Sequence, residues 1–323
     1  MSPTRWALLV AALIASCLLA IAVGTISIPL STVADVLRGG GEGTAAMVVR
    51  TLRVPRALLA VLVGAGLGMS GAALQGSMRN PLAEPYLLGV SGGAAVGAVI
   101  ATLLGAAAAI VPLAAFGGAI AAVTAAFVVA RVAGSRGDAR ILLMAGVVVG
   151  AFANAAIMVL LAHAQENTVR NALWWMMGSV SDATSTQLLV LLGYVVVAGV
   201  LLLILGRRID ILALGEEAAA GLGLDVDRAM RDVFLVSSLL AAATVAAAGL
   251  IGFVGLVVPH IVRAMGARQH RTLIAGSALV GATLVVLSDL LSRTLRPPAE
   301  LPLGAVTALV GVPFFLAKLR RLQ

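Results

Sequence analysis

Ten long apolar stretches run through almost the whole chain. A helix needs about 20 apolar residues to cross the hydrocarbon core of a bilayer, and most of these stretches reach that length. Together they contain two formal charges, Arg263 and Asp289, and both lie near the end of a stretch. The sequence therefore predicts an all-α, polytopic membrane protein with about ten transmembrane helices, at residues 6–26, 58–78, 86–104, 106–130, 141–162, 188–205, 233–250, 251–265, 273–291 and 303–317.

The composition agrees with this fold class. Of the 323 residues, 61% are hydrophobic and 11% are charged, whereas a soluble domain is about half apolar and about a quarter charged. A mean hydropathy of +1.10 excludes a soluble enzyme, a disordered protein and a secreted disulfide scaffold. The single cysteine, Cys17, and three scattered histidines provide no Cys/His metal cluster. A net charge of +8 can indicate nucleic acid as a partner. In a membrane protein, however, the important property is which loops carry the charges, so nucleic acid is not an expected partner.

The distribution of Lys and Arg predicts how the chain is oriented. With the N-terminus inside, the inside loops hold 15 of the 22 Lys and Arg residues, so both termini are expected in the cytoplasm. Residues 14–17, Ile-Ala-Ser-Cys, look like a bacterial lipoprotein cleavage box. The apolar run continues past Cys17 to Val23, however, so a first span that stays attached is the favoured interpretation. Residues 1–323 are treated as a single transmembrane domain.

Missing chemistry narrows the function. A phosphate-binding loop of the G-x-x-x-x-G-K-[ST] type needs a lysine, and the only lysine, Lys318, lies close to the C-terminus. A proton-driven carrier usually holds ionisable groups near the middle of the membrane, and the predicted spans lack them. A membrane-embedded hydrolase would need a facing nucleophile and base, and no convincing pair is present. If the chain transports a solute, the energy must come from a partner.

The longest polar segment on the predicted inner side is 206–232. Within it, residues 216–220 are good helix formers with two acidic residues at the N-terminal end, where the helix dipole favours them. Gly221 and Gly223 would end this helix. A short helix between two spans is a suitable contact for a soluble partner, and a capped loop without a partner is the alternative.

Two further segments predict irregular backbone. Glycines spaced by three and Pro259 interrupt residues 249–263, where His260 is expected to be a hydrogen-bonded polar group. Pro81 and Pro85 end one helix and start another. Irregular backbone at membrane depth persists only where it is buried in protein or lines a cavity. Residues 80–84 are therefore a candidate constriction, with a plain interhelical turn as the alternative.

Three arginines, Arg53, Arg56 and Arg293, fall on the predicted outer side, against the positive-inside bias. Exposed arginines there would suit pairing with carboxylates of a soluble partner. Snorkelling of the side chains to the membrane interface is the alternative.

Taken together, these motifs resemble the FecCD-type permeases, the membrane subunits of ABC importers for ferric siderophores, haem and cobalamin. The likeness covers nearly the whole chain. Its landmarks are Arg53-Val54-Pro55-Arg56, the run from Asn80 to Gly93, residues 212–223, residues 252–263, Glu300-Leu301-Pro302-Leu303-Gly304, Thr307 and Gly311-Val312-Pro313. The resemblance implies the type II ABC importer permease fold, with the pathway between two copies in a homodimer. Two ABC ATPase subunits and a periplasmic or lipid-anchored substrate-binding protein would complete the importer.

The resemblance also implies roles for individual residues. Arg53, Arg56 and Arg293 match positions that meet acidic residues of the binding protein in the cobalamin importer. The segment that contacts the ATPase matches a set in the 206–232 loop, namely Leu214, Gly215, Glu216, Glu217, Gly221 and Gly223. The cytoplasmic gate positions match Asn80, Leu82, Ala139 and Arg140, and an arginine at the last of these departs from the family pattern.

The expected function is translocation of a ferric siderophore or another iron complex across the bacterial inner membrane, with cobalamin or haem as the alternative cargo. Glu84, where many siderophore permeases have Asp, points slightly toward the cobalamin branch. The chain is expected to catalyse no bond chemistry and to hold no metal or cofactor. ATP and Mg would be used by the partner ATPase.

Overall fold

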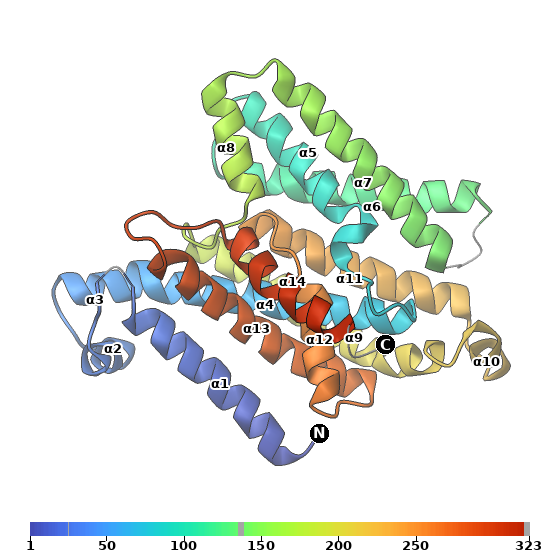
Figure 1. Ribbon diagram of the computed structural model, residues 1–323, viewed down its shortest axis with the longest axis horizontal. Helices are drawn as coiled ribbons and strands as arrows, with labels where there is room; N and C mark the ends of the chain where they lie inside the picture. Colours follow the sequence, from blue (N-terminus) through green and yellow to red (C-terminus); the bar gives the residue numbers. More distant parts are fainter. Residues whose placement is uncertain (25, 135–138, 320–323) are drawn as a thin grey trace.

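The computed structural model describes residues 1–24, 26–134 and 139–319, and every regular element within these ranges is helical. Each of the ten predicted spans corresponds to a helix (Figure 1). These helices are α1 Pro3–Ala22, α4 Val54–Ser77, α5 Val90–Leu103, α6 Val111–Val132, α7 Ala139–Ala162, α9 Ser185–Leu212, α11 Val226–Ala248, α12 Val254–Ala264, α13 His270–Thr294 and α14 Leu303–Leu319. Seven of the described helices are long and apolar enough to cross a membrane, and α5, α12 and α14 are shorter.

Shorter elements connect these helices. The 34-residue span Thr44–Ser77 joins α3 Thr44–Val48 and the π-helical turn η1 Val49–Arg53 to α4. The other connecting elements are α2 Leu30–Leu37, the 3₁₀ turn η2 Pro85–Leu88, α8 Glu166–Met176 and α10 Glu216–Gly221. Several helix starts follow from local sequence: Thr184 and Gln187 form a capping box before α9, and the Asp225 side chain accepts a hydrogen bond from the Arg228 N–H at the start of α11.

The interruption predicted in residues 249–263 is present. The backbone leaves helical geometry after α11, with positive φ at Gly249 (70°) and Phe253 (67°), and α12 begins only at Val254. The predicted span from residue 251 is therefore shorter than expected at its start. Because Pro259 lies inside α12, this short helix also lacks one backbone donor in its interior.

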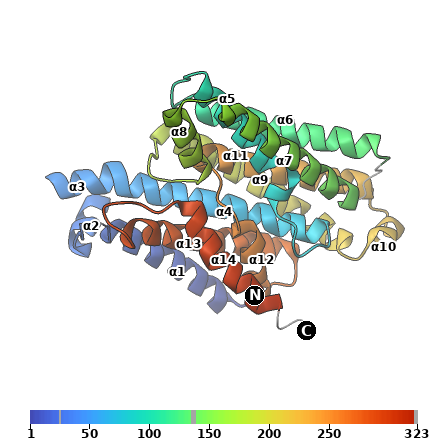
Figure 2. The ribbon, with the colours of Figure 1, turned by 45° about the horizontal axis from the view of Figure 1, so that its top comes forward.

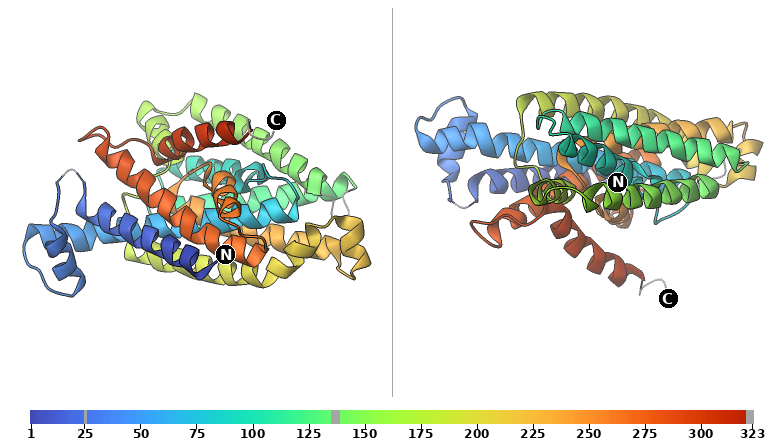
Figure 3. Two further views of the ribbon diagram at one scale, coloured as in Figure 1. Left: turned by 60° about the horizontal axis from the view of Figure 1, so that its bottom comes forward. Right: turned by 90° about the horizontal axis from the view of Figure 1, so that it is seen from above.

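The central helix of the bundle is α4, which packs against α9, α11, α12 and α13. Helices α5 to α8 form a second group, in which α5 contacts α6, α7 and α8 (Figures 1 and 2). Helix α11 lies between the groups, since it contacts both α4 and α6. The end that carries α2 and α3 lies opposite the end that carries α10 (Figure 3).

Glycines allow the tightest of these helix contacts. A Cβ atom added to Gly64 of α4 would lie 2.2 Å from the carbonyl oxygen of Gly281 in α13, and one added to Gly281 would lie 2.2 Å from the oxygen of Gly64. Gly93 of α5 and Gly118 of α6 form a second reciprocal pair, with corresponding distances of 2.3 and 2.2 Å. At both crossings the two backbones touch, so any side chain would force them apart.

Adjacent glycines in α6 make this packing testable. Gly118→Ala places a methyl group against the backbone of α5, and we expect it to destabilise the protein by about 1–3 kcal/mol. Gly117→Ala in the same helix meets no atom of the described residues within 4 Å, and alanine favours helix by up to about 1 kcal/mol. Thermal unfolding in detergent measures both. Equal melting temperatures for the two variants would contradict the close-packing account.

Candidate functional site

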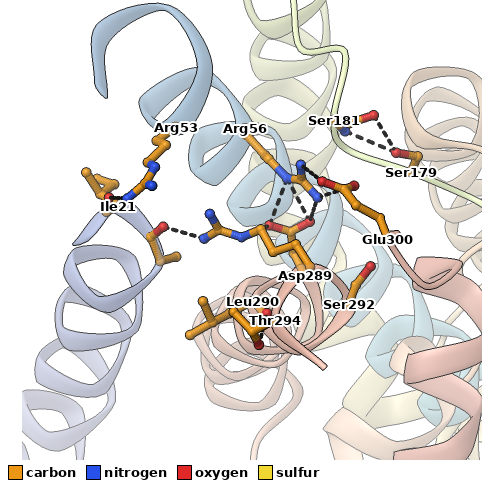
Figure 4. A network of polar contacts seen from close by, with 12 residues as sticks. Ile21, Arg53, Arg56, Ser179, Ser181, Asp289, Leu290, Ser292, Thr294 and Glu300 are labelled. Carbon is orange, nitrogen blue, oxygen red and sulfur yellow. Dashed lines mark hydrogen bonds and ion pairs between the residues drawn. The ribbon is translucent and has the colours of Figure 1, made fainter. Parts of the chain in front are cut away.

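Arg56 is the centre of an ionic cluster (Figure 4) in the first turn of α4, at the end of the molecule that carries α2 and α3 (Figure 1). Its guanidinium group donates to both carboxylate oxygens of Asp289 in α13, at 2.8 to 3.1 Å. The same group donates to both oxygens of Glu300, which precedes α14, at 2.7 and 2.8 Å. One arginine of α4 therefore joins the end of α13 and the segment before α14, both more than 230 residues away, in the two-pronged geometry that favours arginine–carboxylate pairs.

Arg53 and Arg293 flank this cluster and bind the end of α1. Arg53 Nη1 donates to the carbonyl oxygens of Ile21 and Ala22 at 2.7 and 2.9 Å, and Nη2 donates to Ile26. Arg293 donates to the carbonyl oxygen of Ala20, and its Nε lies 3.5 Å from Asp289. The last carbonyl groups of a helix lack partners within the helix, so these side chains complete the C-terminal end of α1.

The expectation that these three arginines are exposed is wrong. Arg53 and Arg293 are each 7% exposed, and the side chain of Arg56 is 13% exposed. Their hydrogen bonds go to other groups of this chain, and the acidic partners of Arg56 lie more than 200 residues away, where local sequence patterns do not reveal them. The hydrogen bonds from Arg56 hold the pKa of Glu300 below its usual value, so Glu300 remains a carboxylate. Contact with a binding protein through these arginines stays a prediction.

The two acidic partners of Arg56 differ in burial, and their substitutions should differ accordingly. Asp289→Asn leaves two buried guanidinium groups with less negative charge, so we expect it to destabilise the fold by about 3–5 kcal/mol. Glu300 is 43% exposed, so Glu300→Gln should cost at most about 1 kcal/mol. Asp35→Asn, in an exposed pair with Arg38, is the control and should be nearly neutral. Thermal unfolding in detergent with Glu300→Gln as damaging as Asp289→Asn would overturn this ranking.

The predicted coupling segment is a helix at the opposite end of the molecule. Helix α9 extends to Leu212, and the short helix α10 occupies Glu216–Gly221, as the sequence predicted for residues 216–220. Leu214 is 64% exposed, and Glu216, Glu217, Gly221 and Gly223 are exposed as well. Gly215 and Gly223 have positive φ (112° and 80°), which explains glycine on both sides of α10. The segment therefore presents an exposed apolar residue beside an acidic helix start.

The gate loop, residues 78–84, is a structured turn held against α12. Asn80 Oδ1 accepts a hydrogen bond from the Leu82 N–H at 2.9 Å, and Leu82 itself is 46% exposed. His260 Nε2 lies 3.0 Å from the carbonyl oxygen of Pro81. Glu84 Oε1 accepts from the Phe253 N–H at 2.9 Å, where α12 begins. The gate loop and α12 are thus connected at two points, and His260 has the hydrogen-bonded role that the sequence predicted.

The second pair of predicted gate residues lies at the start of α7. This helix begins at Ala139, whose side chain is outside the described part of the structure, and Arg140 is exposed. The turn η2, which follows the gate loop, packs on α7. A Cβ atom added to Gly146 would lie 2.7 Å from the Leu87 oxygen, so the backbones are in contact there. The structure therefore connects the chain after the gate loop to α7 through η2.

Sequence reasoning missed the contact between the gate loop and α10. Arg79 Nη2 lies 3.7 Å from Glu216 Oε1. Arg79 also has a positive φ of 49°, which is rare for a residue other than glycine. One signal was available in the sequence, because an arginine follows the end of a predicted span where glycine is the common residue.

Comparisons with known proteins agree with this architecture. The family model described as the FecCD transport family matches residues 12–321. The cobalamin import system permease protein BtuC of Halobacterium salinarum is 42% identical, over 88% of this chain and 76% of that protein. The Fe(3+) dicitrate transport system permease protein FecD of Escherichia coli is 35% identical, over 97% of this chain and 96% of that protein. A solved structure described as an inward-facing metal-chelate type ABC transporter has a TM-score of 0.89 at 28% identity and covers 99% of this chain and 100% of that one.

Proposed function

Because the chain belongs to the FecCD transport family of ABC importer permeases, we propose that its cargo is a ferric siderophore or another iron complex. It is a multi-pass membrane protein of a family whose members are permease subunits for iron chelates, haem or cobalamin, not enzymes. The observation that carries the iron proposal is the match to the ferric dicitrate permease along almost the entire length of both chains. Cobalamin or haem is the alternative cargo, and the 42% identity to a cobalamin permease supports the cobalamin alternative.

The residue type at Glu84 does not distinguish an iron complex from cobalamin. Its carboxylate caps the start of α12 through the Phe253 N–H, so it has a structural partner inside the chain. A large chelate that must be released again is best moved along surfaces that bind it weakly. Apolar helices such as α7, which is mostly exposed in the single chain, fit that requirement.

The complete importer would contain a second copy of this chain, two ABC ATPase subunits and a periplasmic or lipid-anchored binding protein. The poorly buried faces of α7 and α14 support a second copy, because apolar surface on that scale needs lipid or protein against it. The exposed α10 segment supports an ATPase contact. No metal or cofactor is proposed for the chain itself, since ATP and Mg would bind to the ATPase.

In this proposal, the end that carries α10 lies in the cytoplasm of the bacterial cell. Arg5 donates to the Met265 carbonyl oxygen at 2.6 Å, and His270 Nδ1 lies 2.7 Å from Asp210 at the end of α9. These contacts gather the N-terminal residues, the loop after α12 and the end of α9 at one end. Helix α14 starts near Glu300 and runs away from the arginine cluster, so its C-terminal end is placed with them. The Lys and Arg distribution favours the same placement for both termini.

In the proposed cycle, the loaded binding protein docks at the outer end, and ATP binding and hydrolysis in the partner displace the α10 segments. The residues matched to the gate, Asn80, Leu82, Ala139 and Arg140, would then separate between the two copies. The permease forms and breaks no covalent bonds. It provides a pathway for the cargo that opens alternately to one side of the membrane and to the other.

The docking role of the arginines can be separated from their structural role. If Arg56 binds a carboxylate of the binding protein, Glu300 competes for the same guanidinium group. Glu300→Gln should then tighten binding-protein association about two- to fivefold, most clearly at low salt. Calorimetry or surface plasmon resonance on detergent-solubilised complexes measures it, with Asp35→Asn as control. Unchanged affinity would leave Arg56 a purely structural residue.

Uptake into proteoliposomes tests the function itself. Vesicles would contain this chain, its ATPase and its binding protein, and ferric siderophore, haem and cobalamin would be offered separately. We expect accumulation of the iron complex only with ATP inside the compartment that faces α10. The control replaces the ATPase with a hydrolysis-deficient variant, which should abolish accumulation.

Two results would contradict the proposal. Accumulation of cobalamin or haem in place of the iron complex would reassign the cargo and retain the importer class. Uptake by the purified chain without ATPase or ATP, driven by a proton gradient, would support a secondary carrier instead.

A further inference from the structure

Arg79 lies where the central helix α4 gives way to the gate loop. Helix α4 ends at Ser77, and the N–H groups of Met78 and Arg79 donate to Leu74 and Gly76 as the helix closes. Arg79 then adopts the left-handed conformation, with φ of 49°. Glycine is the usual residue at this place after a helix, because a Cβ atom makes the left-handed region unfavourable by about 1–2 kcal/mol. An arginine that is kept in this conformation needs a reason beyond ending the helix.

The side chain of Arg79 supplies that reason, because it reaches the coupling segment. Its Nη2 atom lies 3.7 Å from Glu216 Oε1, at the first residue of α10. Its Nη1 atom lies 3.3 Å from a Cβ built on Gly215, and it is the one neighbour within 4 Å among the described residues. The guanidinium group therefore lies over the start of α10. Both partners are about half exposed, so the pair can separate and form again at little cost.

The backbone of Arg79 continues into the gate loop, which is held on its other side by α12. The next residue, Asn80, forms the turn that includes Leu82, and Pro81 and Glu84 contact His260 and Phe253. A displacement of α10 thus has a short physical route through one side chain to the gate loop, and from there to α12.

We infer that Arg79 is a positioning residue that transmits the movement of α10 to the gate loop. This inference rests on the proposed function, since it assigns the route by which an ATPase beneath α10 would open the inner end. Arg79 contacts no cargo in this role. Its contact with Glu216 holds the gate loop against the start of α10, so that the two segments move together.

The left-handed backbone provides a variant that removes the side chain without harming the fold. Arg79→Gly relieves the unfavourable conformation, so the melting temperature should be unchanged or higher. We expect cargo transported per ATP hydrolysed to fall about two- to fivefold, while ATP hydrolysis still responds to the binding protein. Arg79→Lys, which keeps the charge, should retain part of the coupling. Combining Arg79→Glu with Glu216→Arg should restore more coupling than Arg79→Glu alone.

The pair Arg208–Asp232 is a matched control, because it is a half-exposed ion pair at the same end of the molecule, 3.3 Å apart, that does not include the gate loop. Arg208→Ala should leave transport per ATP unchanged. If Arg208→Ala lost as much transport per ATP as Arg79→Gly, the loss would follow from a change of surface charge alone, and the inference would be overturned. Unchanged coupling in Arg79→Gly, or an exchanged pair no better than Arg79→Glu alone, would overturn it too.

A second measurement separates this inference from the identity of the cargo. In a Cys17→Ser background, a single Leu82→Cys substitution places a thiol on the exposed gate residue. Its rate of modification by a water-soluble thiol reagent should change when the ATPase binds nucleotide, and Arg79→Gly should abolish that change. If no offered cargo accumulates but this response is present and depends on Arg79, the cargo assignment fails and the transmission role stands. A nucleotide response that persists in Arg79→Gly would refute the role.

Discussion

Contact between helix backbones at glycine is the constraint on which this bundle depends. Lipid is as apolar as a leucine side chain, so helices in a membrane gain little by hiding apolar surface from it and associate mainly through close packing. Around α4 this packing is achieved where side chains are absent, at Gly64 against Gly281 and at Gly71 against Gly255. The carbonyl oxygens at these crossings occupy the space of a side chain. Helices α4, α12 and α13 therefore form one closely packed unit, and both ends of that unit carry the polar residues of functional interest.

The two ends of this unit are held differently. At the end that carries α2 and α3, Arg56 is paired with both Asp289 and Glu300, and Arg53 and Arg293 complete the end of α1. Removing one partner from a buried pair costs about 3–5 kcal/mol, so this end resists rearrangement. At the opposite end, the contacts between α10 and the bundle include half-exposed ion pairs such as Arg79–Glu216. Motion driven from outside is easier to accommodate there.

The sequence was sufficient for the spans and for α10 because both depend on local patterns: apolar length in the first case, helix formers bounded by glycine in the second. It placed Arg53, Arg56 and Arg293 at one end of the molecule, where they lie together, but expected them to be exposed and they are largely buried. The side preferred by a charge is a statistical property of loops, whereas burial depends on partners. Asp289 and Glu300 are 233 and 244 residues from Arg56, and no local pattern indicates that pairing. The left-handed backbone of Arg79 likewise follows from how α4 ends and from contact with α10.

The difference in strength between the two ends would suit the proposed importer, in which a partner ATPase supplies the energy. A conformational change is shifted only by the difference in interaction free energy between its two states. An exposed ion pair contributes about 0.2–1 kcal/mol, so it can guide one segment along with another without opposing the change strongly. A buried pair in the same position would hold the gate loop in one state. The strained backbone at Arg79 also favours a gate loop that can move, because the observed turn is less stable than a glycine turn would be. The gate loop is thereby held by its neighbours α10 and α12 more than by its own conformation, and it should follow them when they move.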